Sequence, residues 1–223
     1  NGRMRALHLS KELQGSGDGR GGGFNREPDP AMTLDNTFKV YLFWITSRMN
    51  NCHYCLGHQE HKLLTAGVKD DTIAALDGDW SEFTPAERAA FAFTRKLTFE
   101  PHRIMDADVA ELAKFYKPQQ VLEIIYTVAG YNGTNRWTDS LGIPAEKDGS
   151  RFGKEDGPKV DLSTFVTPTS DAYRDKPTKI ALARDAIGKR GPLEPMDAVE
   201  EQLAKARKRT ARVPMADEEA VVK

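Results

Sequence analysis

Apolar residues that recur at helical spacing are the feature of this sequence that most restricts its fold. From Leu34 to Met49 they fall three or four positions apart, and others fill much of the opposite side. This spacing is typical of an α-helix, and apolar residues on both sides predict a helix that is buried nearly all round. No stretch alternates convincingly at the period of two that a half-buried strand shows, so we expect an all-α fold. The pattern consists of Leu34, Phe38, Tyr41, Leu42, Ile45 and Met49 on one side and Val40, Phe43 and Trp44 on the other.

Capping residues and helix-ending glycines predict five further helices before residue 145. Thr84-Pro85-Ala86-Glu87 is a strong helix start, because it combines a capping box with proline at the first helical position. Gly67 and Gly142 mark helix ends, since glycine readily adopts the left-handed conformation that follows a last turn. The expected helices span about 52–66 and 70–76, start near residues 84 and 106, and run from 118 to about 141.

Composition divides the chain into three predicted parts. Residues 1–30 end in a glycine-rich stretch, 15–30, that we interpret as a flexible segment. Residues 31–145 hold the helical pattern and form the predicted domain. Residues 146–223 are expected to be an irregular, partly helical extension, with an irregular stretch at 146–177 and helices over about 178–187 and 195–209. The second of these helices carries a narrow apolar stripe: Met196, Val199, Leu203 and Ala206. A helix start at Asp217 and a first residue other than methionine indicate a piece of a longer polypeptide.

Charge and hydropathy argue against several classes of partner. The formal net charge of the 223-residue chain is −1, which is too small to attract nucleic acid or an anionic membrane surface. No run approaches the roughly 20 apolar residues of a membrane-spanning helix, and no signal-peptide pattern opens the chain. We expect a cytoplasmic protein that binds a small or neutral partner, with no nucleic acid and no membrane.

The chain has two cysteines, and both lie in one motif, Cys52-His53-Tyr54-Cys55. A single pair cannot form the framework of disulfides that stabilises small secreted domains, so a redox or metal role is favoured. At the first turn of a helix, unpaired backbone N–H groups and the helix dipole would stabilise a thiolate. Side chains three residues apart lie roughly 5 to 6 Å apart, close enough for a disulfide after a small adjustment. The motif predicts a pair in which one thiol attacks and the other resolves.

Two other interpretations of the motif stay open. His58 and His61 continue the spacing of three, and two cysteines with two histidines could bind zinc. At about 100° per residue, however, Cys52 and His61 would face opposite sides of one helix. The sequence also lacks the loop that usually separates the two halves of a Cys/His zinc site, and we therefore expect no bound metal. The last interpretation takes the cysteines as small buried residues and the histidines as a solvated face.

Three segments in order give the chain a resemblance to a known family. They are SRMNNCHYCLGHQEHKLLTAGV, FTPAERAAFAFTRKLTFEPHRIMDADVAEL and VLEIIYTVAGYNGTNRWTDSLGIP, within roughly residues 31–145. They resemble the redox helix and the following helices of the AhpD-like alkylhydroperoxidase and carboxymuconolactone decarboxylase family. The resemblance implies an AhpD-like helical bundle that assembles into a homo-oligomer, such as a trimer or hexamer. It also implies thiol-dependent reduction of peroxides, with no cofactor beyond a redox-active disulfide and with an external dithiol as reductant.

The resemblance also implies roles for single residues. Cys55 matches the cysteine that attacks the peroxide, and Cys52 matches the one that resolves the sulfenic acid as a disulfide. The family's usual proton relay has a histidine four residues after the second cysteine and a glutamate about twelve before the first. This chain has Gln59 and Val40 there, and neither can move a proton. His58 lies only about 60° round the helix from Cys55, so we expect it to be the base.

Four further residues are weaker candidates for lining a substrate pocket. Tyr54 precedes Cys55 directly, where a hydroxyl could donate a hydrogen bond to a leaving oxygen, and Gln59 lies one turn after Cys55. Asn132 and Trp137 on the last predicted core helix complete the set.

The sequence therefore predicts a thiol-dependent oxidoreductase that uses the Cys-x-x-Cys pair to reduce a hydroperoxide, or a disulfide in a partner such as a dithiol protein. One alternative is a non-catalytic subunit that keeps the fold for assembly, which the loss of the usual glutamate and histidine favours. Another is a Cys/His metal-binding protein. A lactone decarboxylase is disfavoured, because those relatives generally lack the cysteine pair.

Overall fold

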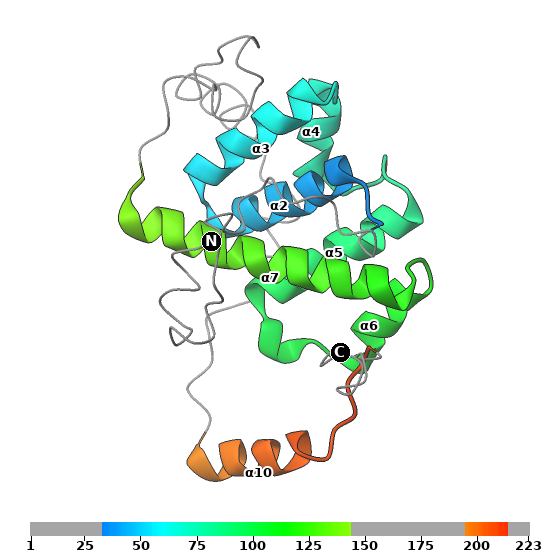
Figure 1. The fold of residues 1–223 in the computed structure, drawn as a ribbon, viewed down its shortest axis with the longest axis vertical. Helices are drawn as coiled ribbons and strands as arrows, with labels where there is room; N and C mark the ends of the chain where they lie inside the picture. Colours follow the sequence, from blue (N-terminus) through cyan, green and yellow to red (C-terminus); the bar gives the residue numbers. More distant parts are fainter. Residues whose placement is uncertain (1–32, 144–194, 214–223) are drawn as a thin grey trace, which may run out of the picture. The chain divides into compact units, whose positions relative to one another are not determined.

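The computed structural model describes residues 33–143 and 195–213. This part of the chain contains α-helices, one short 3₁₀ helix and no strand, so the predicted all-α fold is confirmed (Figure 1). The elements are α2 (Asn36–Asn50), α3 (His53–Thr65), α4 (Asp70–Leu76), α5 (Pro85–Phe99), η1 (Pro101–Arg103), α6 (Asp106–Ala113), α7 (Pro118–Leu141) and α10 (Met196–Ala206). The predicted segments at 15–30, 146–177 and 178–187, and the helix start at Asp217, lie outside the described residues. Across the described ranges, no helix combines the length and the apolar character needed to cross a membrane.

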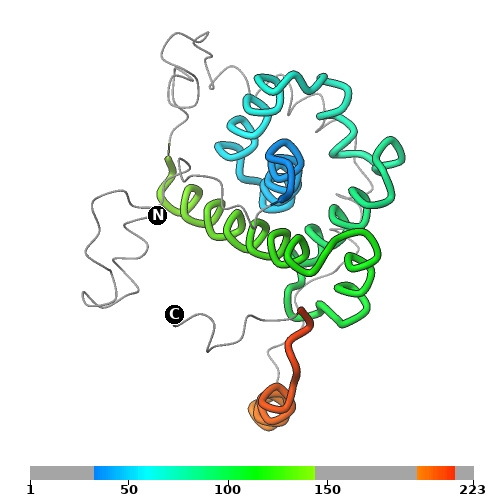
Figure 2. Tube along the Cα trace, turned by 45° about the vertical axis from the view of Figure 1, so that its right-hand side comes forward, coloured from blue at the N-terminus to red at the C-terminus, as the bar shows by residue number. Residues whose placement is uncertain are grey.

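Helix α2 is the central helix of the bundle. It packs against α3, α4, α5 and α7, and Figure 2 shows it end-on with these helices around it. Leu42 and Ile45 are buried on one side of α2, and Phe43 and Trp44 are buried on the other, each no more than 3% exposed. The prediction of a helix buried nearly all round is therefore confirmed.

An aromatic cluster joins α2 to α5. The ring of Phe91 contacts Phe38 and Tyr41 of α2, and Trp80 and Phe83 from the segment before α5, at centroid distances of 5.0 to 6.3 Å. Phe91 itself is fully buried. Aromatic pairs at such distances add to the stabilisation that burial provides, so this cluster fixes how α5 lies against the central helix.

Helix starts and ends follow the local sequence. Thr84 and Glu87 form the predicted capping box, in which each side chain accepts the other residue's backbone N–H. Gly67 and Gly142 have φ values of +83° and +57°, in the left-handed region that few residues other than glycine adopt. These residues explain why helices α3, α5 and α7 lie within two residues of their expected bounds.

Helix α7 crosses α2 and then reaches the start of α3. Glu123, which is 4% exposed, fixes the first half of α7 against α2. Its carboxylate accepts hydrogen bonds from the Lys39 ammonium at 2.8 Å and from the backbone N–H of Leu34 at 3.1 Å. Further along α7, Asn135 and Thr138 are also buried. Two polar side chains are thus enclosed at the junction of α2, α3 and α7.

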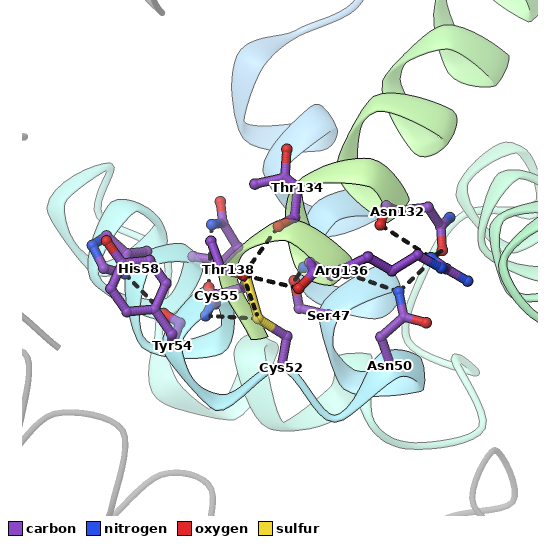
Figure 3. Close-up of a disulfide and its surroundings, with 12 residues drawn as sticks. Ser47, Asn50, Cys52, Tyr54, Cys55, His58, Asn132, Thr134, Arg136 and Thr138 are labelled. Carbon is purple, nitrogen blue, oxygen red and sulfur yellow. Dashed lines mark hydrogen bonds between the residues drawn. A yellow bond between two sulfur atoms is a disulfide. The ribbon is translucent and has the colours of Figure 1, made fainter. Parts of the chain in front are cut away.

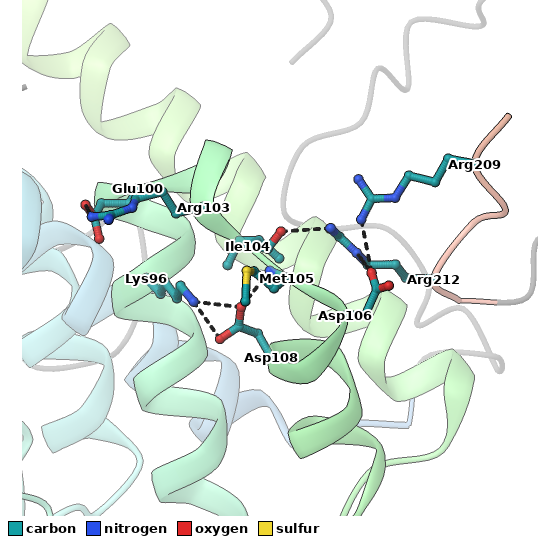
Figure 4. Close-up of polar contacts among 9 residues, drawn as sticks. All are labelled: Lys96, Glu100, Arg103, Ile104, Met105, Asp106, Asp108, Arg209 and Arg212. Atoms are coloured by element: carbon teal, nitrogen blue, oxygen red, sulfur yellow. Dashed lines mark hydrogen bonds and ion pairs between the residues drawn. The ribbon is translucent and has the colours of Figure 1, made fainter. Parts of the chain in front are cut away.

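The described part of the predicted extension consists of Pro195, α10 and the seven residues after it. None of the residues of α10 is buried, and Met196 and Leu203 of its apolar stripe are 72% and 56% exposed. After α10, Arg209 and Arg212 bind the carboxylate of Asp106, and Arg212 also donates to the carbonyl oxygen of Ile104 (Figure 4). These bonds link residues 209–212 to the start of α6.

Candidate redox site

A tight turn between α2 and α3 sets the position of the cysteine pair. Asn51 adopts a left-handed backbone conformation with φ 56°, and Cys52 then caps α3. The backbone N–H of Cys52 donates to the carbonyl oxygen of Ser47 at 2.9 Å. Asparagine tolerates the left-handed conformation better than most residues, so the sequence suits this short connection. Cys55 consequently lies in the first turn of α3, as predicted.

Cys52 and Cys55 are joined by a disulfide, with their Cα atoms 5.3 Å apart. This separation lies in the usual range for disulfides, about 4.4 to 6.8 Å. The prediction that the two sulfurs are near enough to bond is confirmed. Both residues are buried, at 0% and 2% exposure. The two sulfurs are therefore covered by surrounding side chains.

The sulfur of Cys52 also caps helix α3. It accepts the backbone N–H of Cys55 at 3.4 Å. After reduction, the same N–H and the positive end of the helix dipole would favour a negative charge on this sulfur. The start of α3 can therefore assist ionisation of the pair.

A single hydroxyl contacts both sulfurs. The Oγ1 atom of Thr138 lies 3.3 Å from the sulfur of Cys52 and 3.2 Å from the sulfur of Cys55 (Figure 3). It also lies 3.0 Å from each of two backbone carbonyl oxygens on α7, those of Thr134 and Asn135. Thr138 is 3% exposed, so this polar contact forms away from bulk water.

Aromatic side chains pack around the cysteine pair. Phe43 is buried with the two cysteines, and Tyr54 and Tyr131 pack against them. The rings of Phe43 and Tyr131 stack with centroids 3.7 Å apart. Burial raises the pKa of Tyr131 to about 12, so its phenol keeps its proton at neutral pH. In these apolar surroundings an ionised thiol depends on hydrogen bonds from its immediate neighbours.

His58, the predicted base, is held by Tyr54. Its Nδ1 lies 2.8 Å from the carbonyl oxygen of Tyr54, and the two rings pack with centroids 4.2 Å apart. His58 is 5% exposed and follows Cys55 by three residues in α3. Tyr54, a predicted pocket residue, therefore contacts both the cysteine pair and the imidazole.

Gln59 and Val40, which stand where the family's usual proton relay has a histidine and a glutamate, make contacts of other kinds. The Gln59 amide donates to the carbonyl oxygen of Cys55 at 3.2 Å and accepts from the Lys62 ammonium at 3.5 Å. Val40 is 6% exposed and belongs to the main hydrophobic core. Gln59 thus contacts the backbone of the redox helix, and Val40 contributes to packing.

The pocket candidates on α7 point to different surroundings. Asn132 accepts a hydrogen bond from Asn50 at 3.0 Å, and this Asn50 amide also donates to Asn135 at 2.9 Å (Figure 3). Asn135 donates in turn to the Ser47 hydroxyl at 3.1 Å. Trp137, in contrast, is 49% exposed. Asn50, Asn132 and Asn135 thus form a polar network with Ser47 beside the cysteine pair.

Glu60 and His61 lie further along α3. His61 is 7% exposed, and burial lowers its pKa, with smaller contributions from the charges of His58 and Lys62. Glu60 accepts a hydrogen bond from the Trp44 indole at 3.3 Å. Among the residues that the structure describes, no group of three or more His, Cys, Asp or Glu side chains is placed to hold a metal ion.

Thr138 is the site residue that the sequence analysis missed. It follows Asn135, which is also buried, by three residues, so both share one face of α7. Threonine is an ordinary residue in a helix, and nothing near it in the sequence shows that α7 passes over Cys52. The hydroxyl becomes a candidate only when the two helices are placed together.

Comparison with known proteins gives a partial likeness to solved structures. The chain matches no family model and no curated protein. Among solved structures, it is similar to that of the debrominase Bmp8 in complex with 2,3,4-tribromopyrrole. The sequences are 26% identical over 51% of this chain and 62% of that chain, with a TM-score of 0.46. The chain thus covers less than two thirds of that protein, and a TM-score of this size decides no activity.

Proposed function

We propose that this chain is an AhpD-like thiol oxidoreductase that reduces a hydroperoxide, or a disulfide in a partner, through Cys55 and Cys52. The observation that carries the proposal is the bonded pair at the start of α3, with Cα atoms 5.3 Å apart. A helix start favours the thiolate form, which is the nucleophile. A neighbouring thiol at bonding distance allows the oxidised product to be resolved within one chain.

With a hydroperoxide, the reaction has two steps. The Cys55 thiolate attacks the terminal oxygen of the hydroperoxide, the O–O bond breaks, and Cys55 becomes a sulfenic acid while the alkoxide leaves and takes up a proton. The Cys52 thiol then attacks the sulfenic sulfur, and the disulfide forms with loss of water. The hydroperoxide gains two electrons, and an external dithiol returns them to the pair. No bound cofactor takes part in this scheme.

His58 is the proposed base for the first step. A carbonyl oxygen only accepts hydrogen bonds, so the 2.8 Å contact to Tyr54 requires a proton on Nδ1. In the neutral ring, Nε2 then carries the lone pair that can take the thiol proton. The imidazolium would return that proton to the leaving alkoxide. Tyr54, Gln59, Asn132 and Trp137 remain proposed pocket residues.

The test counts thiols in the reduced protein before and after addition of cumene hydroperoxide without a dithiol. We expect two thiols to disappear per chain in the wild type. Cys55→Ser should consume no hydroperoxide, and Cys52→Ser should stop at a sulfenic acid that dimedone traps. An exposed substitution, Ser81→Ala, is the control. A thiol count that hydroperoxide and hydroxyethyl disulfide both leave unchanged would overturn the proposal.

A non-catalytic assembly subunit is the second candidate. The observation that favours it is the replacement of two relay groups by Val40, which packs in the core, and by Gln59, which bonds a backbone carbonyl. In that case, the wild type and Cys55→Ser would show the same negligible turnover, while both keep the homo-oligomeric state proposed for the chain. Gel filtration with light scattering measures that state alongside turnover.

A further inference from the structure

We propose that Thr138 is a positioning residue of the dithiol site, whose hydroxyl donates to whichever sulfur is ionised and passes a proton between the two. The inference rests on the proposed redox cycle of Cys52 and Cys55. It adds a hydroxyl from another helix, α7, to a cysteine pair that lies at the start of α3. Its starting point is that one oxygen lies within 3.3 Å of both sulfurs.

The protons on the Thr138 hydroxyl and on its neighbours determine which hydrogen bonds this hydroxyl makes. A hydroxyl has one proton to donate and two lone pairs that accept. In the disulfide state neither sulfur carries a proton, so the Thr138 hydroxyl donates to a carbonyl oxygen of α7, that of Thr134 or Asn135, each 3.0 Å away. This local bond is common for threonine in helices. The hydroxyl therefore has a resting partner that it can leave when the pair is reduced.

Reduction of the disulfide changes the hydrogen-bond partners that are available to the Thr138 hydroxyl. When one sulfur is a thiol and the other a thiolate, Oγ1 of Thr138 can accept the S–H of the first and donate its own proton to the second. A hydrogen bond to an ionised sulfur is stronger than one to a neutral carbonyl, so the hydroxyl turns toward the thiolate. If both protons shift together, the charge moves from one sulfur to the other, with no net gain or loss of protons.

The surroundings make this hydrogen bond important. Cys52, Cys55 and Thr138 are all nearly fully buried, and desolvation disfavours a thiolate. Phe43 supplies no hydrogen-bond donor. The backbone N–H of Cys55 supports the sulfur of Cys52, whereas the sulfur of Cys55 contacts the side-chain hydroxyl of Thr138 at 3.2 Å. Thr138 thus offers the hydrogen bond that the attacking thiolate needs.

The exchange also suits the second step of the cycle. When Cys52 attacks the sulfenic acid of Cys55, it must lose its proton, and the leaving hydroxide must gain one. The Cys52 proton can pass to Oγ1 of Thr138 while the Thr138 proton goes to the departing hydroxide, which leaves as water. The S–S bond forms, the S–O bond breaks, and Thr138 ends as it began.

The experiment measures thiol ionisation, with no peroxide present. Thiolate absorbance near 240 nm is followed against pH in reduced protein, for the wild type, Thr138→Val and Thr138→Ser. Valine keeps the shape of threonine and removes the hydroxyl, whereas serine keeps the hydroxyl. Loss of a hydrogen bond to a charged group corresponds to a rise of about one pKa unit. We expect this rise in Thr138→Val and a value near wild type in Thr138→Ser.

Single-cysteine proteins test the claim that the hydroxyl serves both sulfurs. Thr138→Val should raise the remaining thiol pKa in both Cys52→Ser and Cys55→Ser backgrounds. In the intact pair, a less stable thiolate should shift the equilibrium with glutathione about tenfold toward the disulfide, or about 30 mV. Equal pKa values in wild type and Thr138→Val would overturn the inference, as would a Thr138→Ser protein that matches Thr138→Val.

If Thr138→Val does not fold, Thr138→Ala provides the same comparison with Thr138→Ser. The proposed function fails separately, when hydroperoxide and disulfide leave the thiol count unchanged even though Thr138→Val shifts the thiol pKa. Conversely, normal peroxide turnover in the wild type with no pKa shift in Thr138→Val leaves the proposed function standing and removes Thr138 from it.

Discussion

The Nδ1 atom of His58 lies 2.8 Å from the carbonyl oxygen of Tyr54, and this contact determines which nitrogen of the ring can act as a base. A carbonyl oxygen cannot donate, so Nδ1 carries the proton and Nε2 keeps its lone pair in the neutral ring. The ring also packs on the Tyr54 side chain. Tyr54, which directly precedes Cys55, therefore sets both the tautomer and the position of the imidazole.

Replacing His58 by phenylalanine should slow the oxidation of the reduced pair by hydroperoxide. Phenylalanine keeps an aromatic ring against Tyr54 but removes the base, and a positioned base typically contributes a factor of about 10² to 10⁴. The rate of thiol loss after mixing with cumene hydroperoxide measures the effect at neutral pH. At a pH above the thiol pKa the difference from wild type should narrow, because the thiol then ionises without help.

His53→Gln is the control for this prediction. His53 lies on the same helix and is exposed, so its replacement should leave the oxidation rate close to that of the wild type. A His58→Phe protein that reacts as fast as His53→Gln at neutral pH would remove His58 from the mechanism.

Helix positions were predictable because their determinants are local. The capping box of Thr84 and Glu87, the glycine at 67 and the run Asp70–Leu76 each act within one or two turns of chain. The proximity of Cys52 and Cys55 was predictable for the same reason, since a separation of three residues at a helix start brings the sulfurs together wherever the helix packs.

Contacts between distant segments were not predictable from local pattern. Thr138 is 83 residues from Cys55 in the chain, and it meets the sulfurs only because α7 crosses α2 and ends over α3. Trp137 was a predicted pocket residue, yet successive helical residues differ in direction by about 100°. Trp137 is 49% exposed while the next residue, Thr138, is 3% exposed. Packing, rather than residue type, decides which of the two faces the site.

Acidification should destabilise the fold through His61. Burial holds the pKa of the folded imidazole below its usual value of 6.5. Above pH 6.5 the His61 ring is neutral in both the folded and the unfolded chain. The contribution of this ring to the free energy of unfolding is then fully present. As the pH falls below 6.5 the unfolded chain takes up the proton first, so stability is lost until the folded pKa is passed. Urea unfolding at about pH 7.5 and about pH 5.5 measures the difference.

His61→Gln provides the comparison, because glutamine has no proton to gain in this range. Its free energy of unfolding should change less than that of the wild type between the two pH values. His102→Gln, in the exposed 3₁₀ helix, is the control, and its free energy of unfolding should change with pH as that of the wild type does. If the free energy of unfolding changes equally with pH in the wild type and in His61→Gln, other groups cause the acid sensitivity.

Removing the Lys39 ammonium should destabilise the contact between α2 and α7. Lys39→Met leaves the carboxylate of Glu123, which is 4% exposed, with its backbone donor Leu34 but without the ammonium at 2.8 Å. Breaking a buried ion pair by removing one partner costs about 3 to 5 kcal/mol, and the partial exposure of Lys39 places the expected loss nearer 2 kcal/mol. Chemical denaturation measures it.

The exposed pair of Lys114 and Glu111 is the matched control. Lys114→Met should change the free energy of unfolding by no more than about 0.5 kcal/mol, since exposed pairs contribute little. Adding Glu123→Gln to Lys39→Met should recover part of the loss, because the buried charge is then gone. A double variant less stable than Lys39→Met would contradict this account.

Alanine at two glycines should shift stability in opposite directions. Gly67 has φ +83°, and a Cβ built there meets nothing within 4 Å, so Gly67→Ala suffers from backbone strain alone. That strain is about 1 to 2 kcal/mol.

Gly130 lies inside α7, where a Cβ also meets nothing within 4 Å. Alanine is favoured over glycine in a helix interior by about 0.5 to 1 kcal/mol, so Gly130→Ala should raise the free energy of unfolding. Thermal unfolding of both variants beside the wild type tests the pair. A Gly130→Ala protein less stable than the wild type would contradict this account.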